Sequence, residues 1–183
     1  MKKIFAHASL AIMALTGFSA MAQSSGLQTL VSITGAYCIG VKTMQQAYDN
    51  TPLEMQTCSL RKEGQLFMGG LQNWLFTDGN TYTRVQYMPP LMPVGEGYCV
   101  TKGAEGQPLT LQKCTKEGEK GFLNPQLFTI YGGQIMASRN GGEFTVVAAG
   151  SDASGPIAGS PVTLEKENLK SKAQKFAISP API

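Results

Sequence analysis

Histidine is nearly absent from this chain, because the only one is His7, near the N-terminus. If the first residues are removed on export, no imidazole remains, which excludes Ser-His-Asp and Cys-His catalysis and histidine metal sites. The four cysteines have no Cys-x-x-Cys spacing, which disfavours a zinc site. The glycine-rich stretch 150–159 lacks the lysine of a phosphate-binding loop. We therefore expect a protein that is not an enzyme and that holds no cofactor or metal.

Long apolar runs are also scarce. The one at residues 4–18 has the features of a targeting signal. It follows Lys2 and Lys3 and ends before an Ala-Met-Ala motif at 20–22, which is typical of a cleaved secretory signal peptide. We expect residues 1–22 to be removed and residues 23–183 to form one domain. The predicted destination is the periplasm or the medium, by export of the Gram-negative bacterial type. No other stretch approaches the roughly 18 apolar residues of a spanning helix, so we expect no membrane insertion.

The chain carries no strong excess of charge of either sign. Without Lys2 and Lys3, thirteen basic residues oppose twelve acidic residues, which leaves a net charge of +1. Such a balance argues against a nucleic acid or an anionic membrane surface as the partner.

What the sequence does contain is a motif that occurs three times, a Gln two residues before an aromatic residue. The pairs are Gln72 and Trp74, Gln126 and Phe128, and Gln174 and Phe176. Two further motifs precede each pair: an aromatic-x-apolar triplet at 37–39, 98–100 and 144–146, and a segment that begins with Pro-apolar at 52–58, 108–114 and 161–167. A recurring unit of this length indicates an internal repeat whose copies bury their apolar faces against one another.

The cysteines follow the repeat, which predicts their pairing. Cys38 and Cys58 occupy two motif positions in copy one, and Cys99 and Cys114 occupy the same positions in copy two. Copy three has Thr145 and Glu167 there, so it lacks both cysteines together. Four cysteines in an exported chain allow three pairings. This pattern selects Cys38–Cys58 and Cys99–Cys114, each worth about 3 kcal/mol in the chain-entropy model.

The segments are short, alternate apolar with polar residues and are separated by turn residues, which predicts strands. Asp78-Gly79 and Gly132-Gly133 follow the first two aromatic motifs and are strong hairpin signals. The third motif has no such hairpin, so we expect its partner to be an N-terminal strand at 27–33. Four strands in each of three copies then close a barrel of about twelve strands. A β-sandwich would explain the alternation but not the threefold repeat.

These motifs resemble the ricin-type β-trefoil family, which is built from three Cys … Cys … Gln-x-Trp units. The resemblance covers about residues 27–179 and is most specific in copy one, since Phe replaces Trp in the other two copies. It implies an all-β fold, a single β-trefoil of three pseudo-repeats. It also implies that Trp74, Phe128 and Phe176 lie in the core.

The resemblance further implies carbohydrate binding, but the expected sugar-binding residues are replaced. The family has an Asp two positions after the first Cys, an aromatic two positions before the second Cys, and an Asn before the Gln. The first position holds Gly40, Thr101 and Val147, the second Gln56, Gln112 and Glu165, and the third Leu71, Pro125 and Ala173. We therefore expect a lectin-like module for a carbohydrate or glycosylated surface, without a galactose site of the usual type.

Two segments remain as candidate binding sites. In copy one, Tyr48, Asp49 and Asn50, with Glu54 and Gln56 on the following strand, offer an aromatic face beside polar groups suited to a sugar. The alternative is that residues 48–50 form an ordinary turn.

The second candidate is the proline-rich segment 87–94, in which Tyr87, Leu91 and Met92 would contact a protein partner. The alternative is that this segment plugs the end of the barrel. A protein-binding role would make the chain similar in architecture to the receptor-binding subunits of cytolethal distending toxins. A β-trefoil inhibitor of a secreted hydrolase is a third possibility.

Overall fold

The computed structural model describes residues 28–42, 49–58, 72, 74–76, 82–88, 97–115, 121–140 and 142–180. The expected signal peptide lies outside these residues, as do Tyr48, Leu91, Met92 and the Asp78-Gly79 turn.

The described part of the chain is built from β-strands and two short 3-10 helices. Copy one contributes β1 (Gln28–Ser32), β2 (Tyr37–Gly40), the two-residue β3 (Thr51–Pro52), β4 (Glu54–Thr57) and β5 (Trp74–Phe76). Copy two contributes β6 (Val85–Tyr87), β7 (Tyr98–Thr101), β8 (Thr110–Lys113), the 3-10 helix η3 (Gly121–Leu123) and β9 (Thr129–Tyr131). Copy three contributes β10 (Gln134–Asn140), β11 (Glu143–Ala149), β12 (Val162–Lys166), the 3-10 helix η4 (Lys172–Gln174) and β13 (Phe176–Pro180).

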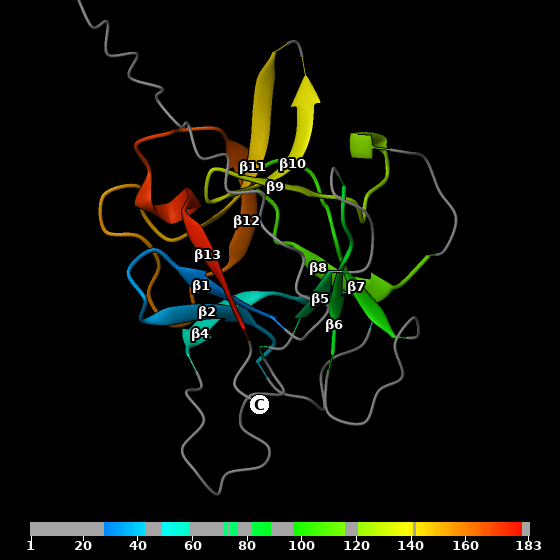
Figure 1. The fold of residues 1–183 in the computed structure, drawn as a ribbon, viewed down its shortest axis with the longest axis horizontal. Coiled ribbons are helices and arrows are strands. Elements are labelled where there is room, and N and C mark those ends of the chain that lie inside the picture. Colours follow the sequence, from blue (N-terminus) through cyan, green and yellow to red (C-terminus); the bar gives the residue numbers. More distant parts are fainter. Residues whose placement is uncertain are drawn as a thin grey trace, which may run out of the picture.

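Three antiparallel strand pairs join the copies to one another. β5 pairs with β6, β9 with β10, and β13 with β1. In the last pair, Gln28 lies opposite Pro180 and Ser32 opposite Phe176, so the first and last strands run side by side (Figure 1). This confirms the predicted pairing of the N-terminal strand with the third motif strand. Because each strand of this pair covers the other, neither presents that edge to solvent.

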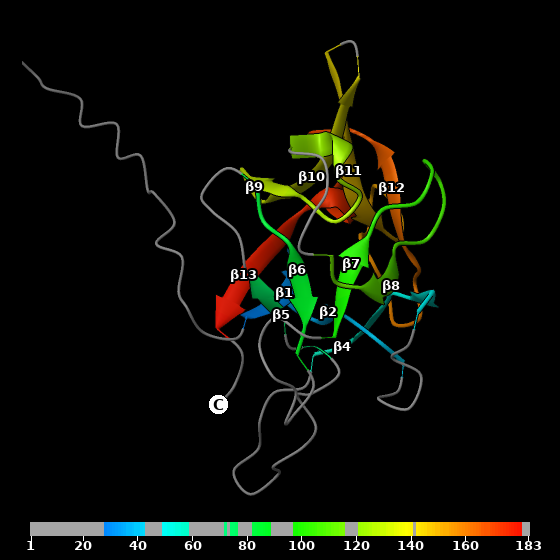
Figure 2. The ribbon, with the colours of Figure 1, turned by 90° about the vertical axis from the view of Figure 1, so that its right-hand side faces the viewer.

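A second set of antiparallel pairs lies within the copies: β2–β4, β7–β8 and β11–β12. Each hairpin belongs to one copy, and the three copies, with five, four and four strands, together form the expected β-trefoil. Copy three departs from the other two in its β10–β11 hairpin, whose strands have seven residues each. This hairpin projects beyond the rest of the fold (Figure 2).

The three hairpins meet in a closed ring of backbone hydrogen bonds. The N–H of Leu53 donates to the carbonyl of Leu109 at 2.9 Å, that of Leu109 to Val162 at 2.8 Å, and that of Val162 to Leu53 at 3.1 Å. These three residues each follow the motif proline, and each is at most 1 % exposed. A buried N–H without a partner is costly, so each copy depends on the next to satisfy its own backbone.

The aromatic residues of the repeated motif form the core, as predicted. Trp74 and Phe128 are fully buried and Phe176 is 5 % exposed. The indole Nε1 of Trp74 donates to the carbonyl of Ile39 at 3.1 Å, which satisfies its polar atom inside the protein. Phe has no such donor, which explains why it can replace Trp in copies two and three without leaving an unpaired group.

Both predicted disulfides are present. Cys38 bonds to Cys58 and Cys99 to Cys114, with Cα–Cα distances of 4.9 and 5.0 Å. Each disulfide ties the first strand of a hairpin to the end of the second strand.

The alignment of copy three was wrong by one residue. Cys38 lies opposite Gln56 and Cys99 opposite Gln112, whereas in copy three Val146 lies opposite Glu165. Val146 therefore takes the place of the first cysteine, and it is fully buried as the cysteines are. Thr145 pairs with Lys166 instead.

The same shift puts Ala148, not Val147, at the position of the family's Asp. Matching Phe144 to the tyrosines of the other copies caused the error. A one-residue slip exchanges the two faces of a strand, and burial decides which register forms. An irregularity in the β10–β11 pairing, between Met136 and Ser138, accompanies the longer hairpin.

Replacing Phe128 with Ala is expected to lower the free energy of unfolding by about 3–5 kcal/mol, because it empties a fully buried position. Urea denaturation of the oxidised protein measures this loss. Tyr131→Ala is the control, since Tyr131 is 68 % exposed and its removal should change stability by no more than about 0.5 kcal/mol. Equal effects of the two substitutions would contradict a core role for the motif.

Candidate functional site

The glutamines of the repeated motif hold the three hairpins in the same way. The side-chain Nε2 of Gln72 donates to the carbonyl of Thr57 at 2.8 Å, that of Gln126 to Lys113 at 3.0 Å, and that of Gln174 to Lys166 at 2.8 Å. Each acceptor is the residue before the second cysteine position. The glutamines are 2–3 % exposed, so the motif fixes the hairpins and leaves little of itself for a ligand.

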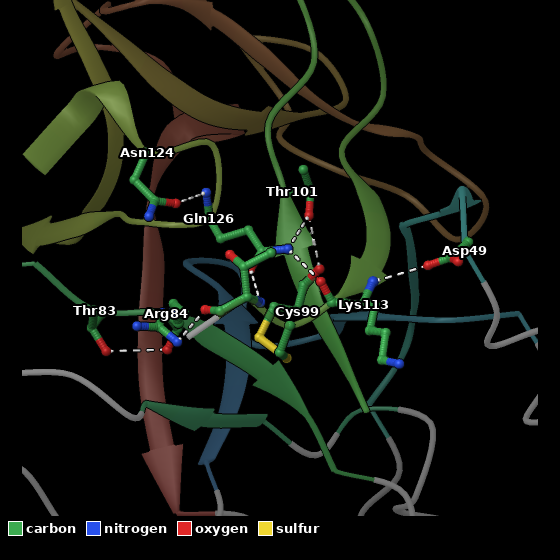
Figure 3. The surroundings of a disulfide bond; sticks show 10 residues. Asp49, Thr83, Arg84, Cys99, Thr101, Lys113, Asn124 and Gln126 are labelled. Atoms are coloured by element: carbon green, nitrogen blue, oxygen red, sulfur yellow. Dashed lines mark hydrogen bonds between the residues drawn. A yellow bond between two sulfur atoms is a disulfide. The ribbon is translucent and has the colours of Figure 1, made fainter. Parts of the chain in front are cut away.

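The hairpin of copy two is closed by groups from its own copy and from copy one. Gln126 also donates to the hydroxyl of Thr101 at 3.1 Å, at the position of the family's Asp. From copy one, the Asp49 Oδ1 accepts a hydrogen bond from the Lys113 backbone N–H at 2.9 Å (Figure 3). The Asn50 Oδ1 accepts one from the Gln112 side chain at 3.3 Å. Asp49 and Asn50 thus join copy one to copy two.

Asn50 also has a left-handed backbone conformation. Glycine has this conformation at the equivalent positions of copies two and three. The φ of Asn50 is 66°, in the left-handed region, and Gly106 and Gly159 have φ of 77° and 81°. All three donate their N–H groups to the neighbouring copy, with Leu111, Leu164 and Met55 as the respective acceptors. Asn tolerates this conformation better than most side chains. This geometry favours the turn interpretation of residues 49–50.

Lys102, the residue after β7 in copy two, places its ammonium group inside the protein. Its Nζ donates to the carbonyls of Phe122 at 3.1 Å and Ala137 at 2.6 Å, and lies 5.3 Å from the ring centroid of Phe128. Burial lowers the pKa of Lys102 to about 8. The ammonium group is therefore used within the protein, where it links copy two to strand β10 of copy three.

Glu54 and Gln56 lie together on β4 in copy one and are half-buried. Gln56 donates to the carbonyl of Val41 at 2.6 Å and more weakly to Glu54 Oε1 at 3.4 Å. They stay candidates for ligand contact on the copy-one hairpin, but Asp49 and Asn50 are directed at copy two and do not join them.

Copy three has an open pocket at the corresponding place. Its volume is about 480 Å³, within the range of small-molecule sites. The residues that line it are Glu105, Ala148, Gly150, Asp152, Thr163, Glu165, Lys166, Asn168, Ala173 and Gln174. Three of these, Ala148, Glu165 and Ala173, stand at the positions of the family's Asp, aromatic and Asn. The sugar-site position is therefore hollow in copy three, although its usual residues are missing.

The loop that brings Asp152 to the pocket depends on a close backbone approach. Gly150 has φ of 80°, and a Cβ added to it would lie 2.5 Å from the carbonyl oxygen of Gly155. Ser151 and Gly155 bond to each other through both backbone N–H groups, at 2.8 and 3.2 Å. Glycine is required here, because both the space and the backbone angle exclude a side chain.

The polar groups of the pocket are held by one another. The Asn168 Nδ2 donates to Asp152 Oδ2 at 3.2 Å, and the Thr163 hydroxyl donates to Glu165 Oε1 at 2.9 Å. Gln174 Oε1 accepts the backbone N–H of Asn168 at 2.7 Å, which ties this residue to the repeated motif. The carboxylates are therefore positioned by the hairpin and by the loop of residues 150–155.

Tyr87 was predicted as a partner contact, and this prediction is wrong. Its side chain is fully buried, and its ring packs 5.6 Å from that of Trp74. Burial raises the pKa of its hydroxyl to about 12. Tyr87 therefore belongs to the core, while the rest of the segment, residues 89–94, lies outside the described residues. Leu91 and Met92 lie outside the described residues.

The pocket was not predicted from the sequence, because copy three lacks the binding residues of the ricin-type pattern. Glu165 stands where that pattern has an aromatic residue, and Asp152 lies in the glycine-rich stretch 150–159. Glu105 comes from copy two, so an alignment of copies cannot place it beside copy three. A signal was available: Glu165, Asn168 and Asp152 are polar residues of the one hairpin that has no disulfide.

Solved structures of similar fold include carbohydrate-binding and toxin proteins. The chain aligns with the C-half of an earthworm R-type lectin in complex with GalNAc, with a TM-score of 0.57 and 15 % identity over 85 % of this chain and 98 % of that one. It aligns with the mdaA-1 domain with a TM-score of 0.61 and 17 % identity, over 90 % and 99 %.

It also aligns with part of a mosquitocidal holotoxin, with a TM-score of 0.53 and 10 % identity, over 86 % of this chain and 17 % of the toxin. No protein-family model matches the sequence. No curated protein matches it either. At these identities the likenesses show the β-trefoil fold.

Asn50 provides a test of its structural role. Asn50→Gly should leave stability within about 0.5 kcal/mol of the wild type, because glycine adopts positive φ freely and occupies this position in the other copies. Asn50→Ala should cost about 1–2 kcal/mol, since alanine resists the left-handed region. Urea denaturation distinguishes them, and equal stability of the Gly and Ala variants would exclude a backbone role.

The lowered pKa of Lys102 predicts that the free energy of unfolding depends on pH. Below a pH of about 8, Lys102 is protonated in both the folded and the unfolded chain, so the cost of its burial is fully present. As pH rises toward the unfolded value of 10.5, the folded side chain loses its proton first and this cost is relieved.

The free energy of unfolding of the wild type, relative to Lys102→Met, should therefore increase between about pH 7.5 and about pH 9.5. Denaturant titrations at the two pH values measure it. Staying below pH 10 avoids the unfolded-state ionisation of Tyr87. A difference that is flat or that decreases with pH would contradict the buried ammonium.

Proposed function

We propose that this chain is an exported carbohydrate-recognition module that binds its ligand in the copy-three pocket. The observation that carries the proposal is the location of the pocket: an open volume of about 480 Å³ stands where three positions associated with sugar binding in the ricin-type pattern converge. The likeness in fold to an R-type lectin solved with GalNAc supports a saccharide as the ligand class.

The other two copies are less suited to this role. In copy two, Asp49 and Asn50 cover the hairpin and Lys102 is directed inward. In copy one, the side-chain amide of Gln56 donates to the carbonyl of Val41 and is not free for a ligand. Glu54 and Gln56, with Tyr48, remain a secondary candidate surface.

Export is supported by the predicted signal peptide at 1–22 and by the two disulfides, which fit an oxidising compartment. Recognition, rather than catalysis, is supported by the chemistry of the pocket. It is lined mainly by carboxylates and amides, and it contains neither a cysteine nor a histidine. Within the described residues, no group of three His, Cys, Asp or Glu is placed to hold a metal ion.

A second candidate function is that of a binding subunit in a toxin or other secreted complex. The likeness to 17 % of a mosquitocidal holotoxin chain favours it, because the matched region there is part of a longer toxin chain. Leu91 and Met92 stay proposed contacts for such a partner. Inhibition of a secreted hydrolase stays a prediction from the sequence.

The pseudo-threefold repeat supplies matched variants that test which copy binds. Gln56, Gln112 and Glu165 occupy equivalent strand positions in the three copies. On a broad glycan array, the wild type should bind a set of saccharides, and Glu165→Ala should lose that binding by about tenfold or more. Gln56→Ala and Gln112→Ala should retain it.

Loss of binding only in Gln56→Ala would move the site to copy one. A wild type that binds no glycan saturably would refute the carbohydrate proposal. Far-ultraviolet circular dichroism and urea denaturation of each variant verify that the fold is intact.

A further inference from the structure

The copy-three pocket has an unusual balance of charge for a saccharide site. Three carboxylates line it: Glu165 on β12, Asp152 in the loop after β11, and Glu105 from copy two. The one basic residue among its lining residues is Lys166, whose Nζ lies 3.7 Å from the carboxylate of Glu143. The lining residues therefore carry three acidic groups against one basic group.

Three side-chain donors of the pocket each make one hydrogen bond within the protein. The Asn168 Nδ2 is used by Asp152, the Thr163 hydroxyl by Glu165, and the Gln174 Nε2 by the carbonyl of Lys166. Each carboxylate, in contrast, has two oxygens and about four acceptor sites. Most of these sites remain open after the single bonds that Asp152 and Glu165 accept. The pocket therefore offers a ligand more acceptors than donors.

A ligand that complements this surface carries more donors than acceptors. A sugar hydroxyl is both donor and acceptor, an N-acetyl group adds a carbonyl acceptor, and a carboxylate only accepts. A protonated amine has three donors, no acceptor and a positive charge, and its hydrogen bonds to a carboxylate are charge-assisted. From this balance we propose that the pocket selects saccharides that carry a free amino group, such as non-acetylated hexosamines.

The inference rests on the proposed function, since it specifies the saccharide class for the same pocket. Glu105 acts as a specificity residue that reaches in from the neighbouring copy. The proposal also excludes uronic acids and other anionic sugars, which would bring like charge to the three carboxylates. General attraction of cations to the protein does not explain such a preference, because the chain without residues 1–22 has thirteen basic and twelve acidic residues and so a net charge of +1.

The test compares three oligosaccharides of equal length by isothermal titration calorimetry at about pH 6, where a sugar amine is protonated. They are β-1,4-linked glucosamine, its fully N-acetylated form and a polyuronic acid. The glucosamine oligomer should bind at least about tenfold more tightly than the N-acetylated one, and the uronic acid should not bind. Equal affinity for the first two would overturn the amine preference and leave the proposed carbohydrate site standing.

Substitutions in the pocket test whether the preference for the glucosamine oligomer arises there. Asp152→Asn combined with Glu165→Gln keeps the size of both side chains and removes both charges, so the glucosamine oligomer should lose about tenfold in affinity. Glu167→Gln is the matched control, because it removes an acidic group that follows the same strand but is outside the lining of the pocket, and it should bind as the wild type does. If Glu167→Gln weakens binding as much as the double variant does, the preference is a long-range charge effect and the proposal fails.

A final comparison uses spermidine, a polyamine without a sugar. The glucosamine oligomer should bind more tightly than spermidine does, because the sugar hydroxyls add contacts. Equal or tighter binding of spermidine would show that an ammonium group alone is recognised, which would overturn the saccharide class. Absence of all three oligosaccharides from the pocket would instead refute the proposed function itself.

Discussion

The hydrogen-bonded ring of Leu53, Leu109 and Val162 is the constraint on which the rest of the structure depends. Each of the three backbone N–H groups is buried and is satisfied only by the next copy, so no copy is complete alone. The ring fixes the three hairpins against each other at their inner ends. The motif glutamines then fix each hairpin at its outer end, through the carbonyl before the second cysteine position. With both ends held, only the loops and the exposed strand positions are free to differ between copies.

Those differences give the three hairpins different surfaces. In copy two, Asp49 and Asn50 of copy one bond to the hairpin, and Lys102 donates to a carbonyl of copy three. Copy three receives Glu105 from its neighbour, and it remains hollow. It is also the copy without a disulfide, and its strands β10 and β11 are the longest of the described part. One framework therefore supports three chemically distinct faces, which is how a repeat can retain its fold while its binding chemistry changes.

The sequence predicted most of the fold, and the reasons are physical. The barrel closure, both disulfides and the burial of Trp74, Phe128 and Phe176 all follow from patterns that recur in the copies. The one error in alignment arose in copy three, where no cysteine marks the register and burial of Val146 sets it instead. A repeated motif identifies the residues that the copies share, and these residues form the core.

The candidate site was less predictable, because it does not lie in the residues that the copies share. Binding residues lie where the copies differ, and a contact such as Glu105 with copy three joins segments that no single-copy motif connects. Tyr87 shows the reverse problem, since an aromatic residue beside an apolar segment can face inward as readily as outward. The most direct test of this account is a crystal structure with a glucosamine oligosaccharide. It should show the sugar in the copy-three pocket, with its amine beside Asp152, Glu165 or Glu105. A sugar bound against Glu54 and Gln56 instead, with the copy-three pocket empty, would contradict it.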